Sequence, residues 1–315
     1  MPEDKIVSHA KVGIIGGGIM GVSLLYHLAK EGWKDLVLIE KGELTSGSTW
    51  HAAGQCPQMT GSYNLAKVHL HSTNLYKKLE KETGQPTGWH GCGSLRLAYT
   101  QKDLDWFYYV KGILNNVGCS AEIVSTQEIP KIHPFIQLDG IIGGLHTPED
   151  GHTDPTSTTN AMAKGARNSG AEIYRHNRVT NIRQLPTDEW ELVTEKGNII
   201  CEHVVNAAGS FCPEVGLMVG LKNIPSINMI HHYLVTDEHP EIKKLGKELP
   251  VVRDPHSSCY LRQEGKGLLI GIYEKDAKCW ALDGMDWKFD MELLEPDLDR
   301  LEEHLKKGMD RIPQF

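Results

Sequence analysis

Two short apolar runs near the start of the chain enclose a glycine-rich turn and a helical pattern. Residues 11–15 (KVGII) and 36–39 (LVLI) each predict a buried strand. The apolar spacing over 19–30 predicts a helix, and Gly32 stands just past its end, where helices commonly stop. A strand, a helix and a second strand in this order form a right-handed parallel unit. The chain is therefore predicted to begin with an α/β domain.

Later segments alternate between helical and strand periodicity. Leu65, Val68, Leu75 and Leu79 predict the apolar face of a helix over 65–83. The further predicted helices are 100–117, which opens with the capping-box residues Thr100 and Asp103, 155–170 behind Asp154, and a C-terminal run marked by Leu298, Leu301 and Leu305. The predicted strands are 94–99, 172–175, 178–184, 189–194 and 199–206, with a strand-rich pattern again over 226–272. Parallel α/β structure thus gives way to closely spaced antiparallel strands, and we expect two interleaved units rather than two successive ones.

A glycine motif follows the first predicted strand. Gly16, Gly18 and Gly21 form a G-x-G-x-x-G pattern, and Glu40 ends the second strand. In such a pattern the first glycine permits a tight turn, the second lets a pyrophosphate approach the backbone, and the third lets the helix pack on the strand. The helix N-terminus attracts phosphates, and the acidic residue can accept the ribose hydroxyls. The motif predicts a dinucleotide site without separating FAD from NAD, and an ordinary glycine-rich turn is the alternative.

A loop of small residues lies close to this motif in sequence. The segment 45–54 (TSGSTWHAAG) begins five residues after Glu40, so it must lie near the same dinucleotide. Small residues let backbone amides crowd a ligand. We take Ser48, Thr49 and His51 as candidate cofactor contacts. A lone histidine is ordinarily a core or surface residue, but its place in this loop favours a functional role.

A second segment of small residues ends a predicted strand. Residues 204–209 (VVNAAG) run from apolar positions into Ala208 and Gly209. In a doubly wound sheet the carboxyl ends of the strands face the nucleotide crevice. Ala208 and Gly209 are therefore candidate cofactor contacts, with a plain buried strand and turn as the alternative.

Composition narrows the class of protein. With 315 residues the chain has room for about two domains, and 40% hydrophobic with 23% charged residues is typical of globular proteins. A net charge of −8 argues against nucleic acid as a partner. The seven cysteines contain no C-x-x-C pair, which argues against a disulfide framework and a zinc ribbon. No run of about 18 apolar residues is present, so we expect no membrane partner.

Two histidine pairs are the candidate metal ligands. His69 and His71 stand two residues apart on a predicted helix and face different ways, and His231 and His232 are adjacent. No Cys, Asp or further His stands at a spacing that completes either pair. We expect no metal site.

Several segments together resemble the amine-oxidising flavoproteins, a family of the D-amino-acid oxidase type. The resemblance rests on GIIGGGIMG, on the strand that ends at Glu40, and on GSTWHAAG and VVNAAG. Further similarity lies in residues 150–155 (DGHTDP), 231–236 (HHYLVT) and 260–264 (YLRQE). It covers essentially the whole chain and is strongest towards the members that oxidise dimethylglycine or sarcosine.

The resemblance implies a cofactor, a reaction and a set of residues. The cofactor is FAD, joined covalently to His51 through a methyl carbon of the flavin ring. His231 and Tyr260 stand beside the flavin on the substrate side, and both fall on predicted strands. The implied reaction is oxidative N-demethylation of a small N-methyl amino acid, with hydride transfer from the N-methyl carbon to the flavin. The electron acceptor, a flavoprotein or oxygen, is left open.

The resemblance also implies a domain plan. The expected fold is α/β, with a Rossmann-like FAD-binding domain interleaved with an antiparallel β-rich α+β substrate domain. The FAD-binding domain takes 1–84 with 151–220, the substrate domain takes 85–150 with 221–295, and 296–315 is a helix leading back towards the FAD domain. Family members continue past this point, so we interpret the sequence as an N-terminal fragment. Tetrahydrofolate is then a partner only through a missing C-terminal domain.

Two rival functions stay open. One is an NAD-dependent dehydrogenase built on the same βαβ unit, against which VVNAAG and the His51 loop argue. The other is a truncated nucleotide-binding paralogue without turnover. The expected location is the cytoplasm for a bacterial protein and the mitochondrial matrix for a eukaryotic one.

Overall fold

The first of two large sheets contains the predicted parallel unit. The structure is a computed structural model that describes residues 6–314. Its six-stranded sheet has the order β8-β2-β1-β11-β10-β9, in which β8, β2, β1 and β11 are parallel and β10 and β9 antiparallel. The strands are β1 (His9–Ile15), β2 (Leu36–Ile39), β8 (Glu172–Tyr174), β9 (Val179–Gln184), β10 (Trp190–Thr194) and β11 (Gly197–Asn206). Strands β1 and β2 thus pair with β11 and β8, which come more than 130 residues later in the chain.

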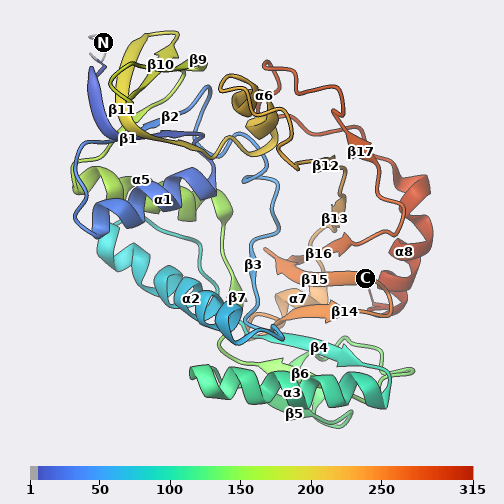
Figure 1. The fold of residues 1–315 in the computed structure, drawn as a ribbon. Helices are drawn as coiled ribbons and strands as arrows, with labels where there is room; N and C mark the ends of the chain where they lie inside the picture. Colours follow the sequence, from blue (N-terminus) through green and yellow to red (C-terminus); the bar gives the residue numbers. More distant parts are fainter. Residues whose placement is uncertain (1–5, 315) are drawn as a thin grey trace.

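Three helices pack on one another and on this sheet (Figure 1). They are α1 (Ile19–Lys30), α2 (Tyr63–Thr83) and α5 (Pro155–Asn168). Leu75 and Leu79 of α2 are buried in their core, as predicted, but Leu65 and Val68 are exposed. The reason is that the first half of α2 packs against α3 (Gln101–Val117) through the small side chain of Ala66, which a search for large apolar residues does not select.

The second sheet is mostly antiparallel and has its own core. Its order is β13-β16-β15-β14-β4-β6-β5, with β14 and β4 as the one parallel pair. The strands are β4 (Ser94–Ala98), β5 (Glu122–Val124), β6 (Gly143–Thr147), β13 (Tyr233–Val235), β14 (Val251–Asp254), β15 (Cys259–Glu264) and β16 (Gly267–Ile272). Helix α3 covers the β4-β6-β5 end (Figure 1). Its Thr100–Asp103 capping box is present, as predicted.

The C-terminal helix belongs to this second unit in the structure. Helix α8 (Leu298–Asp310) packs against β15 and β16, and Leu301 and Ile312 lie in the same core as Leu261 and Ile270. The domain ranges derived from the sequence remain a prediction. Of the three leucines that marked this helix, Leu301 is buried on the second sheet and Leu305 is partly buried there, whereas Leu298 is exposed.

The segment after β17 (Cys279–Trp280) crosses back to the first unit. Met285 N donates to Glu214 Oε1 at 2.6 Å, Lys41 Nζ donates to the Phe289 carbonyl at 2.8 Å, and Met291 N donates to the Ser46 carbonyl at 3.1 Å. The remaining short elements are β3 (Gln55–Cys56), α4 (Ile129–Ile132), β7 (Gly151–His152), η1 (Gly209–Phe211), α6 (Cys212–Leu217), β12 (Asn228–Met229) and α7 (Pro240–Lys243). The two units are therefore interleaved, as expected from the sequence.

None of the helices between residues 6 and 314 combines the length and the apolar character needed to cross a membrane.

Candidate functional site

The glycine turn between β1 and α1 has two positions that cannot take a side chain. Gly16 has a φ of +115°, and a Cβ atom there would lie 2.3 Å from the Ala207 carbonyl oxygen. A Cβ atom on Gly21 would lie 2.0 Å from the Gly16 carbonyl oxygen. Gly18 is different, because its Cβ would meet only Thr49 Oγ1, at 3.0 Å. Gly16 and Gly21 are thus required by the fold itself, and the space beside Gly18 is free for a ligand.

The start of α1 and the end of β2 are joined by side chains of the predicted site. Ile19 N, in the first turn of the helix, donates to Thr49 Oγ1 at 3.0 Å. Glu40 Oε2 accepts from Gly17 N at 2.6 Å, and Oε1 accepts from Gly42 N at 2.8 Å. Glu40 therefore stabilises the turns at Gly17 and Gly42, a role that was not predicted from the sequence. Each carboxylate oxygen retains a lone pair for a ribose hydroxyl.

The segment after β11 reaches the same place. The Asn206 side chain donates to the Cys212 carbonyl at 2.9 Å and accepts from Ala208 N at 3.2 Å, which fixes the turn at Gly209. Ser48 Oγ lies 3.5 Å from Ser210 Oγ. The structure thus brings together the predicted cofactor residues of all three motifs, which are Gly16, Gly18, Gly21, Glu40, Ser48, Thr49, Ala208 and Gly209.

Beyond Glu40 lies a narrow groove of about 50 Å³. Its walls include Gly16, Glu40 and Ala208 together with Phe211 and Trp287, whose rings stack at 4.9 Å with 20° between their planes. Arg178 lies 5.2 Å from the Trp287 ring. Aromatic and guanidinium planes suit a flat base. The sequence analysis missed these residues because Trp287 comes from the segment that crosses back from the second unit.

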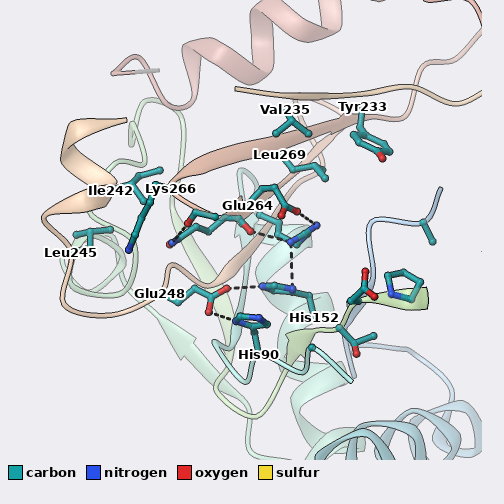
Figure 2. Close-up of a pocket in the computed structure, with 18 of the residues that line it drawn as sticks. His90, His152, Tyr233, Val235, Ile242, Leu245, Glu248, Glu264, Lys266 and Leu269 are labelled. Carbon is teal, nitrogen blue, oxygen red and sulfur yellow. Dashed lines mark hydrogen bonds and ion pairs between the residues drawn. The ribbon is translucent and has the colours of Figure 1, made fainter. Parts of the chain in front are cut away.

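A larger cavity of about 660 Å³ lies between the His51 loop and the second sheet (Figure 2). Trp50 and Ala52, the neighbours of His51, line one side, and Tyr233 and Leu269 line the other. The rings of Trp50 and His51 lie 4.1 Å apart, and the buried Trp50 Nε1 has no hydrogen-bond partner among the described residues. Burial lowers the pKa of His51, so the ring is neutral near pH 7 and keeps a free lone pair.

These features fit an extended dinucleotide such as FAD. Loop 45–54 connects the glycine turn with the large cavity, because Thr49 Oγ1 accepts from Ile19 N at the start of α1 and Trp50 lines the cavity. Three features each match one part of the cofactor. The groove suits a base, the turn at Gly18 has a space that a Cβ would fill, and the indole N–H of Trp50 at the cavity lacks a partner.

The two predicted catalytic residues lie next to each other. Tyr260 OH is 3.4 Å from His231 Nε2. Tyr260 and Tyr233 both stand opposite Gly271, on the two strands that flank β16, so they share the sheet face that borders the cavity. A Cβ on Gly271 would lie 1.8 Å from the Tyr260 ring, so this glycine lets the phenol lie across β16. His231 comes just before β13, so the prediction that it lies on a strand is wrong.

The protonation states of this pair differ from those of exposed groups. Burial lowers the pKa of His231, against the opposing effect of the Glu274 carboxylate. Burial, with Tyr273 nearby, raises the pKa of Tyr260 to about 12. At pH 7 the pair is therefore a neutral imidazole and a neutral phenol, which can accept one proton and donate one hydrogen bond.

A buried carboxylate stands behind the imidazole, and the sequence analysis missed it. Glu274 Oε2 lies 3.8 Å from His231 Nδ1, while Oε1 accepts from the guanidinium of Arg300 on α8. The Glu274 side chain is 3% exposed. At this distance it forms no hydrogen bond to the ring, but its charge lies on the Nδ1 side and favours a proton there, which leaves the Nε2 lone pair towards Tyr260.

A further histidine cluster lines the cavity (Figure 2). His90 Nδ1 lies 2.7 Å from Glu248 Oε2, and His152 Nε2 lies 2.6 Å from Glu248 Oε1. The three ligand atoms are close enough to surround a cation. However, the two rings are stacked at 4.7 Å with 8° between their planes. A metal bound to an imidazole lies near the plane of the ring, and two rings stacked face to face lie in separate planes, so they do not share such an atom. The geometry is that of a carboxylate that bridges two imidazoles. The sequence did not reveal this cluster, because its three residues are far apart along the chain.

Known proteins resemble this chain in sequence and in fold. A rat (Rattus norvegicus) mitochondrial dimethylglycine dehydrogenase is 45% identical over 317 residues, which cover 99% of this chain and 37% of the rat protein. A mouse (Mus musculus) mitochondrial sarcosine dehydrogenase is 34% identical, over 99% of this chain and 34% of that protein. The crystal structure of L-proline dehydrogenase from P. horikoshii matches with a TM-score of 0.83 at 26% identity, covering 98% of this chain and 78% of the other.

The chain thus spans little more than a third of the length of these two dehydrogenases. The expected fold class, with its parallel and antiparallel sheets, is confirmed by the likeness to the proline dehydrogenase. The family model for FAD-dependent oxidoreductases matches residues 11–315. The chain therefore belongs to the FAD-dependent oxidoreductases.

Proposed function

We propose that this chain forms the flavin-containing part of an enzyme that oxidatively demethylates a small N-methyl amino acid, of the dimethylglycine or sarcosine type. The similarity to dehydrogenases of those two names supports the substrate class. The observation that carries the proposal is the neutral His231–Tyr260 pair, in which Tyr260 shares a sheet face with Tyr233, a residue that lines the cavity beside the His51 loop.

The cofactor is held by the residues gathered at the glycine turn. Backbone N–H groups near Gly18 and at the start of α1 would bind the pyrophosphate. Glu40 would accept the ribose hydroxyls, and the Trp287–Phe211 pair would contact the base. His51 is the proposed covalent link, because its neutral ring keeps a nucleophilic lone pair. When bound, FAD supplies the acceptor for the hydride of the N-methyl carbon, and the substrate becomes an iminium.

His231 takes the proton from the substrate amine. A protonated nitrogen has no lone pair to stabilise the developing iminium, so this proton must leave first. Nε2 of His231 is the free acceptor for it, since Glu274 stands on the Nδ1 side. Tyr260 is a poor base at pH 7, because its pKa is raised to about 12, but it is a good donor for orienting the substrate.

The proposal is tested by stopped-flow reduction of the flavin in the full-length protein. We expect anaerobic dimethylglycine or sarcosine to bleach the flavin absorbance, with faster bleaching by the preferred substrate. A coloured protein that neither amine bleaches would instead favour the nucleotide-binding paralogue without turnover. A protein that retains NAD and no flavin would favour the NAD-dependent alternative.

Partners and location follow the same reasoning. Tetrahydrofolate would bind to a domain outside this chain, and the electron acceptor would be a flavoprotein or oxygen. Because the relatives' names place them in mitochondria, we propose the mitochondrial matrix for a eukaryotic source and the cytoplasm for a bacterial one.

A further inference from the structure

Two histidines on neighbouring helices of the first unit face each other, away from the groove and the cavity described above. His27 lies on α1 and His71 on α2, and their Nε2 atoms are 3.4 Å apart. The ring centroids are 5.7 Å apart, with 46° between the ring planes. The sequence analysis considered His71 together with His69 and found no further ligand at a suitable spacing. The structure supplies that ligand from a different helix.

The hydrogen bonds of His27 determine which ring nitrogen carries the proton. Nδ1 lies 2.7 Å from the Ser23 carbonyl oxygen, and Ser23 Oγ lies 3.3 Å from the same atom. A carbonyl oxygen only accepts, so Nδ1 is the donor, and in the neutral ring Nε2 keeps its lone pair. Nε2 is also the atom that faces His71. Metal-binding histidines in proteins are held in the same way, with the second ring nitrogen donating to a carbonyl or a carboxylate.

The separation of the two Nε2 atoms fits a shared metal ion better than a direct hydrogen bond. Hydrogen bonds from N–H groups in proteins are usually about 2.9–3.0 Å long. Zinc binds imidazole nitrogen at about 2.0–2.1 Å in tetrahedral sites, so two such nitrogens lie about 3.4 Å apart. The rings are also inclined to each other, unlike the stacked rings of His90 and His152. Two inclined planes intersect, so one ion can lie in the plane of both rings.

The surroundings of the pair indicate the class of ion. His71 is exposed and His27 is half-buried, so solvent reaches the space between the rings and water can complete the coordination. No carboxylate of residues 6–314 forms an ion pair with either ring. The ligands from the protein are therefore imidazoles alone, which suit zinc, nickel and copper, whereas magnesium and calcium prefer oxygen ligands.

We propose that His27 and His71 form a binding site for a divalent transition-metal ion of the zinc type, which links α1 to α2. This site is independent of the flavin chemistry proposed above. Tyr26 and Lys30 of α1 already contact Glu82 of α2, and the ion adds a further link to the helix that begins at the glycine turn. The two ligands are adjacent only when the helices are packed, so the ion stabilises the folded state.

The first test is a zinc titration of the full-length protein against a chromogenic zinc indicator. Wild type should bind one more zinc ion than His71→Gln or His27→Gln. Each variant keeps a single ligand, and we expect its zinc affinity at this site to fall by about 10-fold or more. Equal zinc binding by wild type and both variants would overturn the proposal. His71 is exposed, so its replacement should leave circular dichroism and flavin content unchanged even if the His27 variant folds poorly.

Thermal unfolding gives a second measurement. Saturating zinc should raise the Tm of wild type by about 2 °C or more, and saturating magnesium should not raise it. In His71→Gln the rise with zinc should be absent. A rise of the same size in wild type and in His71→Gln would contradict a zinc link between the two helices.

Two control variants locate the ion. His203→Gln removes an exposed histidine of β11 and should retain the zinc binding of wild type. His90→Gln removes one imidazole of the cavity cluster and should also retain it, because the stacked rings there do not share an ion. If zinc binding is lost in His90→Gln and kept in His71→Gln, the ion lies at the cavity cluster and the proposal fails.

Discussion

The two halves of the candidate site are built in different ways. At the glycine turn the walls are mostly backbone, and the space between them decides which residues are tolerated, because a Cβ on Gly16 or Gly21 has no room. At the second sheet the active groups are side chains, and their chemistry depends on which of them face one another across strands. The first half should therefore fail when atoms are added, and the second when functional groups are removed.

The largest effect is expected at Gly16. Gly16→Ala places a Cβ 2.3 Å from the Ala207 carbonyl oxygen at a φ of +115°, so we expect a loss of about 3 kcal/mol or more in the free energy of unfolding. Thermal and denaturant unfolding of the full-length protein measure it. The matched control is Gly170→Ala, at a φ of +94° with no atom within 4 Å, which should cost only about 1 kcal/mol. Similar losses in both variants would show that conformational strain alone, not the close approach, decides this turn.

The next effect separates space for the fold from space for the ligand. A Cβ at Gly18 would meet only Thr49 Oγ1, so in Gly18→Val we expect the fold to remain while flavin content falls by about 10-fold or more. Absorbance of the purified protein gives flavin content, and circular dichroism reports the fold. Gly112→Val, at an open position of α3, should retain wild-type flavin. A fully loaded Gly18→Val protein would contradict the dinucleotide assignment.

The covalent link is tested at His51. Acid precipitation of the wild-type full-length protein should leave the flavin in the pellet, whereas flavin from His51→Ala should appear in the supernatant. The reason is that His51 has a neutral ring between two residues that line the cavity. Wild-type flavin found wholly in the supernatant would refute the link without affecting the non-covalent site.

Removing a functional group from the second half should change the pH dependence of the reaction. His231→Ala should slow flavin reduction by about 100-fold at pH 7, within the usual range for a general base, and recover partly as pH rises and the free amine becomes more abundant. Tyr260→Phe should instead weaken substrate binding by a similar factor at every pH. The measurement is stopped-flow flavin reduction from pH 6 to pH 10. An unchanged rate and profile for His231→Ala would move the base elsewhere, with His232 as the next candidate.

The smallest effect is expected at Glu274, which acts through His231. In wild type the flavin reduction rate should fall as pH drops through the His231 pKa, because the base must be neutral. Charged groups that act on this ring are Glu274, which raises its pKa, and His232, Arg253 and Arg300, which lower it. Glu274→Gln removes the raising group, so the acidic limb should shift to still lower pH, and the plateau rate should fall by about 3- to 10-fold because the ring is less well oriented.

The control for this shift is Asp297→Asn. Asp297 is the other carboxylate on Arg300, and it makes no contact with His231. We expect its pH profile to match wild type. A Glu274→Gln protein with a lower rate but an unshifted acidic limb would indicate a structural role for the carboxylate rather than an electrostatic one.

The features predicted correctly from the sequence are local ones, and the errors concern features that depend on packing. The β1–α1 turn, the capping box at Thr100 and the helix that begins after Asp154 were predicted correctly, because each depends on hydrogen bonds within a few residues. Errors arose where packing partners decide. Leu65 and Val68 of α2 are exposed because the small Ala66 faces α3, and His231 falls outside β13 because strand pairing with β16 begins only at Tyr233.

What the sequence alone determined is the nucleotide half of the site, together with the family that its motifs indicate. Its steric requirements are local, so glycine spacing and a strand-end acid suffice to predict it. Only the tertiary structure decided the surroundings of His231 and Tyr260. Arg253 and Glu274 become neighbours of that pair through the register of β14, β15 and β16 and the docking of α8. Register depends on the whole pattern of buried side chains in a sheet, and no short stretch of sequence contains that information.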